Sequence, residues 1–251
     1  MTEKIYMIPV NDAFSVVSNC PFCVLEKDYE NQCIDIVLGE SVMEVDERLE
    51  TNKKGFCTKH FYMLLNQKNK LPFALTLETH LMEVNKNIFS IASKYLSSLD
   101  SQRKLNPIKA LISSTKSNED IINDLNKYLD TLNNSCVICD RINERMNSYF
   151  DVFFYMWKNE KDFQQKVLNT KGFCLPHLNQ IIKLSKSSLS STKLSDFLLK
   201  ILKVQMDNME SLYNSVHDFT QQFDYRNANS VITEEIRSSL SNAVNKLAKF
   251  D

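Results

Sequence analysis

The sequence predicts an all-α protein made of two pseudo-repeated helical modules, each with a Cys₃His metal site at the base of a helical hairpin. Apolar residues recur at three- and four-residue spacing over long segments, which is the pattern of one helix face. Alternating runs typical of strands are few, and the 251 residues include only three glycines for tight hairpin turns. A Gly-Phe-Cys-x-x-His motif also occurs twice, as GFCTKH at 55–60 and GFCLPH at 172–177.

The first helical module is expected over residues 1–99. Its helices are expected at residues 22–37, 41–51, 57–65 and 73–99. Gly39 can end the first of these helices, because glycine readily adopts the conformation that follows many helix ends. Pro72 suits the first turn of the long helix, where its missing N–H group would have no helical partner in any case.

A connector is expected between the modules, over residues 100–134. Residues 97–118 are polar and serine-rich around a short apolar island, so we interpret them as the connection between the halves. Asn118 is followed by two acidic residues and resembles a helix start, which predicts a linking helix that reaches Leu132.

The second helical module is expected over residues 135–223. Its helices are expected at residues 136–154, in a shorter stretch that ends at Leu168, and at residues 192–223. The remaining residues, 224–251, form a C-terminal element. Thr233 is followed by two glutamates, which predicts the start of a last amphipathic helix that reaches Phe250.

The two modules also match outside the cysteine motifs. Residues 73–92 align without gaps to residues 197–216. The alignment pairs Phe73 with Phe197, Leu75 with Leu199, Met82 with Met206, Glu83 with Asp207 and Phe89 with Tyr213. Any one pair could arise by chance in an apolar helix, but together with the repeated cysteine motifs they indicate an internal duplication.

Each half contains a C-x-x-C pair followed by a C-x-x-H pair. The first predicted ligand set is Cys20, Cys23, Cys57 and His60, and the second is Cys136, Cys139, Cys174 and His177. Cys23 and Cys57 lie 34 positions apart, and Cys139 and Cys174 lie 35 apart. A helical hairpin with arms of roughly 20 Å would return the chain to its starting end, so this spacing predicts that the four ligands of each half meet.

Three thiolates and one imidazole are a common ligand set for structural zinc. The predicted cofactors are therefore two Zn²⁺ ions, and [4Fe–4S] clusters are the alternative, because such a cluster also accepts three cysteines and one histidine. Gly55 and Gly172 suit a tight turn with positive φ before each C-x-x-H pair. All four ligands come from the protein, so each site is expected to be closed, without an open position for a reacting water.

Other interpretations of these residues are buried core cysteines or a thioredoxin-like redox pair, although no βαβ pattern surrounds the C-x-x-C pairs. Cys33 lies on an apolar helix face and is interpreted as a core cysteine. His80 shares a helix face with Glu83, which leaves a metal or acid–base site open there, but the duplicate position is Val204. The aromatic residues Phe150, Phe153, Phe154 and Trp157 are interpreted as core.

Charge and composition argue against several classes of protein. The net charge is −1, whereas nucleic-acid-binding proteins normally carry a basic excess. Three glycines cannot form the glycine-rich loops of the common nucleotide-binding enzymes. Residues 1–14 contain no signal peptide, and the most apolar run, 152–157, is too short to cross a bilayer. We therefore expect a cytoplasmic protein with neither a nucleic acid nor a membrane as its partner.

The stretches YMIPVNDAF, NCPFCVLE, LGESVMEVDERLETNKKGFCTKHF and FALTLETHL resemble a bacterial family of unknown function known mainly from low-GC Gram-positive anaerobes. The resemblance extends over nearly the whole chain and is most specific over residues 6–85. It implies a bacterial cytosolic protein and supports the eight cysteines and histidines as the signature. An anaerobic source would strengthen the iron–sulfur interpretation.

These observations favour a metal-stabilised helical binding or scaffold protein without enzymatic activity. Its two sites are expected to hold structural zinc, and its partner is expected to be a protein or a small molecule. The alternative from another functional class is an iron–sulfur redox or metal-trafficking protein that uses the same ligands.

Overall fold

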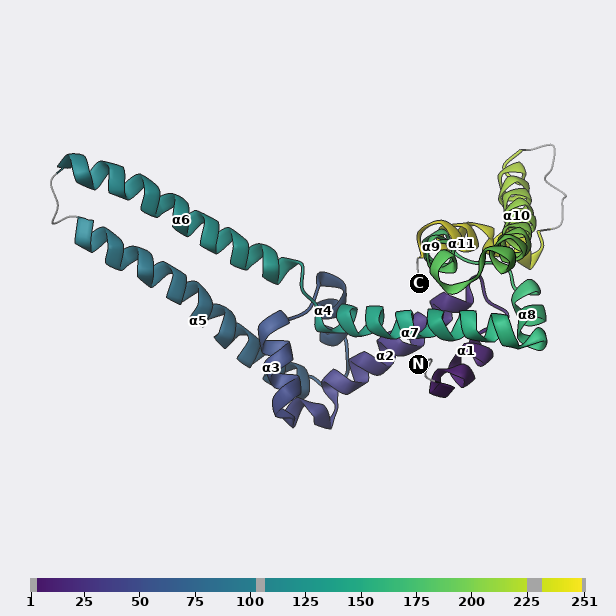
Figure 1. The fold of residues 1–251 in the computed structure, drawn as a ribbon, viewed down its shortest axis with the longest axis horizontal. Coiled ribbons are helices and arrows are strands. Elements are labelled where there is room, and N and C mark those ends of the chain that lie inside the picture. Colours follow the sequence, from purple (N-terminus) through teal and green to yellow (C-terminus); the bar gives the residue numbers. More distant parts are fainter. Residues whose placement is uncertain (1–3, 103–106, 225–231, 250–251) are drawn as a thin grey trace. The chain divides into compact units, whose positions relative to one another are not determined.

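The computed structural model describes residues 4–102, 107–224 and 232–249, and the secondary structure of these residues is helical throughout (Figure 1). The helices are η1 (Lys4–Tyr6), α1 (Met7–Ala13), α2 (Pro21–Leu38), η2 (Glu40–Met43), α3 (Val45–Lys54), α4 (Thr58–Leu65), α5 (Leu71–Gln102), α6 (Pro107–Asn133), α7 (Val137–Asn159), α8 (Lys161–Leu168), α9 (Leu175–Ser188), α10 (Ser191–Gln221) and α11 (Glu234–Ala248). The predicted all-α class is confirmed. None of the described helices combines the length and the apolar character that a membrane span requires.

The chain divides into two compact units that do not follow its two halves. Unit 1 consists of Met1–Tyr29 and Glu144–Asp251, and unit 2 consists of Glu30–Asn143. The boundaries lie inside α2 and α7, so each of these helices contributes one segment to each unit. This division differs from the contiguous modules 1–99 and 135–223 that the sequence suggested.

Unit 1 contains a core that is rich in phenylalanine. Fully buried rings come from the start of α2, the second half of α7, α8, the loop before α9 and α10, namely Phe22, Phe150, Phe153, Phe154, Phe163, Phe173 and Phe197. The aromatic residues of α7 are core residues, as the sequence predicted. Burial of each such ring stabilises the fold by about 1.5–3 kcal/mol relative to exposure, so this cluster dominates the packing of unit 1.

Unit 2 packs α3 and α6 against the long helix α5. Its buried apolar residues come from the end of α2, the loop before α4, α4, the start of α5 and the beginning of α7 with the residue before it, namely Cys33, Ile34, Val37, Phe56, Leu64, Phe73, Cys136, Val137, Ile138 and Ile142. Cys33 is buried in this core, as predicted. Among the side chains that the structure describes, unit 2 buries fewer apolar residues than unit 1.

The expected connection at 97–118 is helical where the structure describes it, because most of it belongs to the long helices α5 and α6, which pack against each other (Figure 1). The linking helix begins at Pro107 and not at Asn118. Pro107 is well placed there, since proline is favoured in the first turn of a helix. A two-helix hairpin needs apolar residues only where its helices meet, so a polar composition did not distinguish it from a loop.

The C-terminal helix begins where the sequence predicted it. Thr233 is its N-cap, and the Thr233 hydroxyl accepts a hydrogen bond from the backbone N–H of Ile236 at 3.3 Å. The helix ends at Ala248, and Lys249 follows it with a left-handed φ of 54°. The predicted last residue, Phe250, lies outside the described residues.

Candidate metal centres

The eight predicted ligands form two clusters, each with three cysteines and one histidine. The unit 1 site consists of Cys20, Cys23, Cys174 and His177, and the unit 2 site consists of Cys57, His60, Cys136 and Cys139. Within each cluster, the possible ligand atoms all lie within 4.8 Å of one another. Both clusters could therefore hold a metal ion.

The predicted grouping of the ligands is wrong, because each C-x-x-C pair meets the C-x-x-H pair of the other half of the sequence. The reason is the course of α2 and α7. Each is one continuous helix that begins in one unit and ends in the other, so the chain has changed unit before it reaches its next ligand pair. Equal spacing in the two halves is as compatible with this exchange as with a local hairpin, so the spacing alone did not distinguish them.

The unit 1 site is almost completely buried. The Sγ atoms of Cys23 and Cys174 are 3.6 Å apart. His177 turns its Nδ1 atom into the cluster, 3.2 Å from the sulfur of Cys174 and 3.5 Å from those of Cys20 and Cys23. Only Cys23 is partly exposed, since the other three side chains are buried.

The unit 2 site has the same geometry with more exposure. The His60 Nδ1 atom lies 3.2 Å from the sulfurs of Cys57 and Cys136 and 3.4 Å from that of Cys139. The Sγ atoms of Cys57 and Cys139 are 3.7 Å apart, and both residues are half-buried. The backbone N–H of Cys139 also donates to the sulfur of Cys136 at 3.5 Å, which stabilises the thiolate form.

These separations fit a single tetrahedral ion. Zinc–sulfur bonds of about 2.3 Å and zinc–nitrogen bonds of about 2.0 Å place the ligand atoms of a tetrahedron roughly 3.5–3.8 Å apart. The sulfur–Nδ1 distances run from 3.2 to 3.5 Å, the sulfur pairs Cys23–Cys174 and Cys57–Cys139 are 3.6 and 3.7 Å apart, and all the ligand atoms of each cluster lie within 4.8 Å of one another. The chain thus brings all four donor atoms of each cluster to nearly the separation that one ion requires.

The repeated glycine shapes the turn before each C-x-x-H pair. Gly55 and Gly172 have φ values of 62° and 75°, in the region that favours glycine. A Cβ atom on Gly55 would lie 2.5 Å from the His80 Nε2 atom, and one on Gly172 would lie 2.8 Å from the Gln205 Oε1 atom. Each glycine therefore allows both the backbone conformation and the close approach of a side chain.

His80 and Gln205 hold these turns in corresponding places. His80 is buried and its Nδ1 atom is 2.9 Å from the backbone oxygen of Asn52. Gln205 donates to the oxygen of Phe173 at 3.0 Å and accepts from the Phe173 N–H at 2.9 Å. His80 is in neither cluster, and the structure matches it with Gln205, one position beyond the Val204 of the gap-free alignment.

Two glutamates on α2 support the ligand histidines, and the sequence analysis did not identify either of them. The Glu30 Oε1 atom lies 2.9 Å from the His60 Nε2 atom, and the Glu26 Oε2 atom lies 3.1 Å from the His177 Nε2 atom. A carboxylate at Nε2 fixes the tautomer that leaves Nδ1 free to bind a metal. Their four-residue spacing on a helix was visible, but acidic residues at this spacing are common on solvated helices.

The protonation of the metal-free clusters indicates why a cation suits them. Burial opposes the charged form of His60, but its hydrogen bonds with Cys136 and Glu30 outweigh burial and raise the pKa of His60 to about 10. Burial likewise raises the pKa of the Cys136 thiol, but the hydrogen bond from His60 outweighs it and lowers that pKa to about 6. Burial and the charge of Cys136 raise the pKa of Cys139, so this neighbour keeps its proton.

The unit 1 cluster follows the same pattern. Its histidine has a pKa raised to about 11, because hydrogen bonds with Cys174, Cys20 and Glu26 outweigh burial. Hydrogen bonds to Cys174 and Cys20 and burial raise the pKa of the Cys23 thiol. Three thiolates cannot coexist so close together without a cation, so a divalent ion would displace these protons and bind more tightly as the pH rises.

A family model described as "Family of unknown function (DUF6062)" matches residues 1–250 of the chain. No curated protein and no solved structure matches the chain.

Proposed function

We propose that this chain, which belongs to the DUF6062 family, is a zinc-stabilised helical binding or scaffold protein that holds one structural Zn²⁺ ion in each unit. We further propose that it is cytoplasmic and acts without enzymatic chemistry at these sites. A reducing compartment keeps the cysteines available as thiolate ligands. The single observation that carries the proposal is the closed Cys₃His geometry of both clusters.

A closed site is typical of structural zinc. Catalytic zinc keeps one position open for water or substrate, whereas structural zinc is bound by four protein ligands. Each cluster supplies four donor atoms at separations that suit one tetrahedral ion. The chemistry that this arrangement supports is therefore stabilisation of the fold and not hydrolysis.

The same separations favour zinc over an iron–sulfur cluster. A cubane cluster binds each protein ligand to a different iron atom, so its ligand sulfurs lie further apart than those that share one ion. Here all the ligand atoms of each cluster lie within 4.8 Å of one another, and the sulfur pairs Cys23–Cys174 and Cys57–Cys139 are 3.6 and 3.7 Å apart. Three thiolates with one imidazole are also a common ligand set for structural zinc.

A metal in either site would join distant parts of the chain. The contact between Cys23 and Cys174 spans 151 positions, and that between Cys57 and Cys139 spans 82. Closing such loops costs conformational entropy, and metal binding that occurs only in the folded chain contributes its free energy to folding. Each ion would therefore stabilise the packing of one whole unit.

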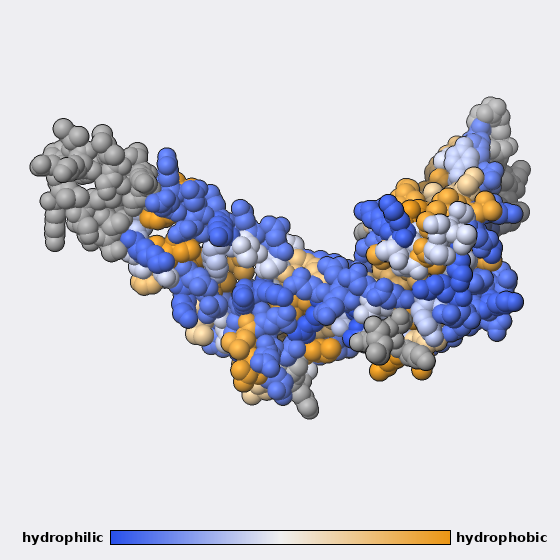
Figure 2. All heavy atoms as spheres, viewed as in Figure 1, coloured by the Kyte–Doolittle hydropathy of each residue, from blue (hydrophilic) through white to orange (hydrophobic). Residues whose placement is uncertain are grey.

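The long helices supply the surface for a binding role. On α10, three exposed apolar side chains follow each other at seven-residue spacing: Leu199, Met206 and Tyr213, which are 72%, 69% and 69% exposed. Figure 2 shows apolar surface among hydrophilic residues in the region of α10. Seven-residue spacing of apolar residues is the pattern through which helices pair side by side, so a protein partner with a helical face would fit this surface.

Metal analysis of protein purified without oxygen tests the proposal. We expect about two zinc ions per chain, a colourless preparation and no labile sulfide. Cys174→Ser and Cys57→Ser should each retain one zinc ion, because the two clusters are separate. A brown preparation with iron and sulfide would instead identify the iron–sulfur alternative, and a chain that folds fully without any metal would contradict both.

A further inference from the structure

In unit 2, the two loops that carry the ligands are joined directly. Ser135, which precedes Cys136, donates its hydroxyl to the backbone oxygen of Lys54 at 2.6 Å. Lys54 lies three residues before Cys57. The backbone N–H of Val137 also donates to the oxygen of Gly55 at 3.1 Å. These two hydrogen bonds hold the C-x-x-C loop against the C-x-x-H loop.

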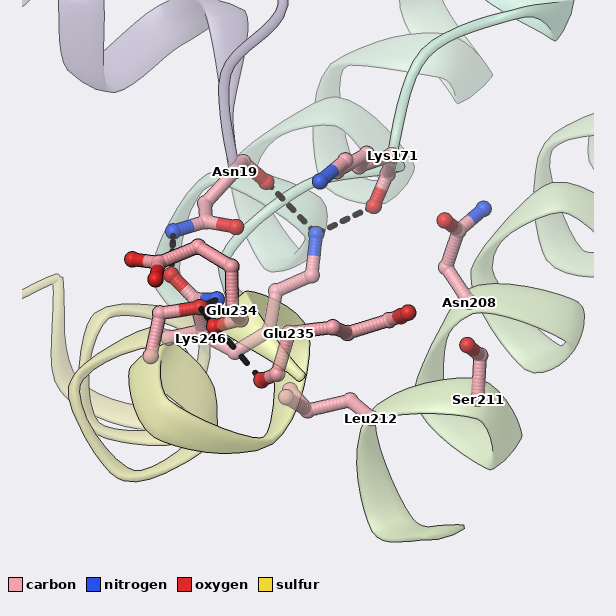
Figure 3. Close-up of a pocket in the computed structure, with 10 residues that line it drawn as sticks. Asn19, Lys171, Asn208, Ser211, Leu212, Glu234, Glu235 and Lys246 are labelled. Atoms are coloured by element: carbon pink, nitrogen blue, oxygen red, sulfur yellow. Dashed lines mark hydrogen bonds between the residues drawn. The ribbon is translucent and has the colours of Figure 1, made fainter. Parts of the chain in front are cut away.

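In unit 1, the corresponding residues are joined through a lysine from α11. Asn19 precedes Cys20, and Lys171 lies three residues before Cys174. The Lys246 ammonium group donates to the backbone oxygen of Asn19 at 2.5 Å and to that of Lys171 (Figure 3). The Asn19 side chain also donates to the Asn242 side chain at 2.7 Å. Helix α11 therefore contacts both ligand loops of this site.

The burial of Lys246 is unusual for a lysine. Its relative exposure is 3%, and it lies beside a cavity of about 380 Å³ that polar side chains of α10 and α11 line (Figure 3). Burial lowers the pKa of Lys246, whereas the nearby cysteines of the unit 1 site act in the opposite direction. A divalent ion with three thiolates has a net charge of −1, so a buried cation beside it is electrostatically favourable.

A second lysine extends the contact between α11 and the site. Lys249, directly after the helix, forms an ion pair with Glu26. Glu26 is the carboxylate that faces the Nε2 atom of His177. The end of α11 thus reaches both the ligand loops and the carboxylate behind the ligand histidine.

We propose that Lys246 is a positioning residue for the unit 1 metal. Through Lys246, α11 holds the two ligand loops of this site together, whereas the ligand loops of the unit 2 site are joined by direct hydrogen bonds. The proposal rests on the proposed function, since it requires a metal in unit 1. Without the ammonium group, the loops of Cys20 and Cys174 lose their common donor and the metal loses a neighbouring positive charge. The unit 1 metal should then leave faster, and the unit 2 metal should not.

The test measures metal release from purified chain loaded with two zinc ions and mixed with excess chelator. Lys246→Met keeps a side chain of similar length without donor or charge, and we expect one of the two ions to leave at least tenfold faster. Lys246→Arg retains the charge and the donors, so its release should be slower than that of Lys246→Met. Ser135→Ala is the matched change in unit 2 and should accelerate the release of the other ion.

Ligand variants identify which ion responds. In a Cys57→Ser background only the unit 1 site is complete, so Lys246→Met should accelerate release there. In a Cys174→Ser background only the unit 2 site is complete, and Lys246→Met should leave release unchanged. The absorption of cobalt in place of zinc adds a readout of the thiolates, and Lys246→Met should shift the sulfur-to-cobalt bands only in the first background.

The outcomes separate the two proposals. Wild-type chain that does not bind two metal ions would contradict the proposed function itself. Two bound ions with release that Lys246→Met does not change, or that it accelerates equally at both sites, would overturn only the role of Lys246. Equal release from Lys246→Met and Lys246→Arg would also overturn it, because donor and charge would then be irrelevant. Helicity measured on each loaded variant shows whether it is folded.

Discussion

The two candidate metal centres share their ligand types but differ in what surrounds them. In unit 1, the rings of Phe22 and Phe150 lie 5.8 and 6.2 Å from the His177 ring, and Cys20 and Cys174 are buried. This site is therefore continuous with the aromatic core. Apolar packing can hold its loops in place to some extent even without a metal.

Several ion pairs lie beside the unit 2 site. Glu30 forms ion pairs with Lys59 at 2.6 Å and with His60, and nearby Arg141 bridges Glu47 and Glu50 at 2.8 and 2.7 Å. Partly exposed ion pairs contribute little to stability. The same ligand set therefore occurs in a unit with a large apolar core and in a unit with a smaller one. We expect the folding of unit 2 to depend more on metal binding than the folding of unit 1.

Ligand substitutions give the largest expected effects and test this difference directly. Binding of structural zinc contributes about 10–16 kcal/mol in small zinc peptides, so loss of either ion should be severe. We expect Cys57→Ser to unfold much of unit 2, because that unit has the smaller apolar core, whereas Cys174→Ser should leave unit 1 helical but less stable. Circular dichroism and hydrogen exchange resolved by peptide would measure both losses, and a greater loss of structure in Cys174→Ser would contradict the comparison.

Alanine in place of the turn glycines should have a smaller effect. Positive φ strains alanine by roughly 1–2 kcal/mol, and the close contacts add to this strain. Gly55→Ala meets the rigid ring of His80, whereas Gly172→Ala meets the flexible end of Gln205, so we expect Gly55→Ala to cost more, about 3 kcal/mol. Urea unfolding of the metal-loaded protein would measure the difference.

A double variant separates the two contributions at Gly55. In a His80→Ala background the contact is absent and only the backbone strain remains, so Gly55→Ala should cost less stability there than in the wild-type chain. If Gly55→Ala costs nothing in the His80→Ala background, the φ value is unimportant, and if it costs the same in both backgrounds, the contact with His80 is unimportant. The same logic applies to Gly172 and Gln205 as the matched pair.

Changes to the two glutamates are expected to have the smallest effects. Loss of a carboxylate behind a ligand histidine typically reduces metal affinity 10–100-fold. Glu30 is buried and forms a hydrogen bond with His60, whereas Glu26 forms an ion pair at a longer distance from His177. Glu30→Gln should therefore weaken the unit 2 site about tenfold, and Glu26→Gln should weaken the unit 1 site less. Competition titrations with a zinc indicator would rank them, and the reverse order would refute the argument.

The sequence predicted the helical class and the residue types of the two clusters, because both depend on local patterns. Apolar periodicity marked α2 and α7, and the starts near Pro72 and Thr233 followed from capping rules. The C-x-x-C and C-x-x-H motifs were recognisable because cysteine and histidine pairs at this spacing are typical of metal ligands. These signals need no knowledge of how distant segments meet.

The exchange of ligand pairs was not predictable in the same way. It depends on α2 and α7 each passing from one unit to the other, and spacing along the chain does not contain that information. The roles of Glu26, Glu30 and Lys246 were hidden for a related reason. Each is an ordinary charged residue on a helix, and only its distant neighbours distinguish it from a solvated one.

The exchange also determines when each site can be completed during synthesis of the protein. The first 99 residues contain four of the eight ligands, yet they contain neither complete cluster. The unit 2 site has all its ligands once the ribosome has released Cys139. The unit 1 site has all its ligands only after His177, and Lys246, which contacts its ligand loops, is synthesised later still. The nascent chain thus contains Cys20 and Cys23 without their two partner ligands until Cys174 and His177 are synthesised, so metal ions bound during synthesis would enter the unit 2 site first.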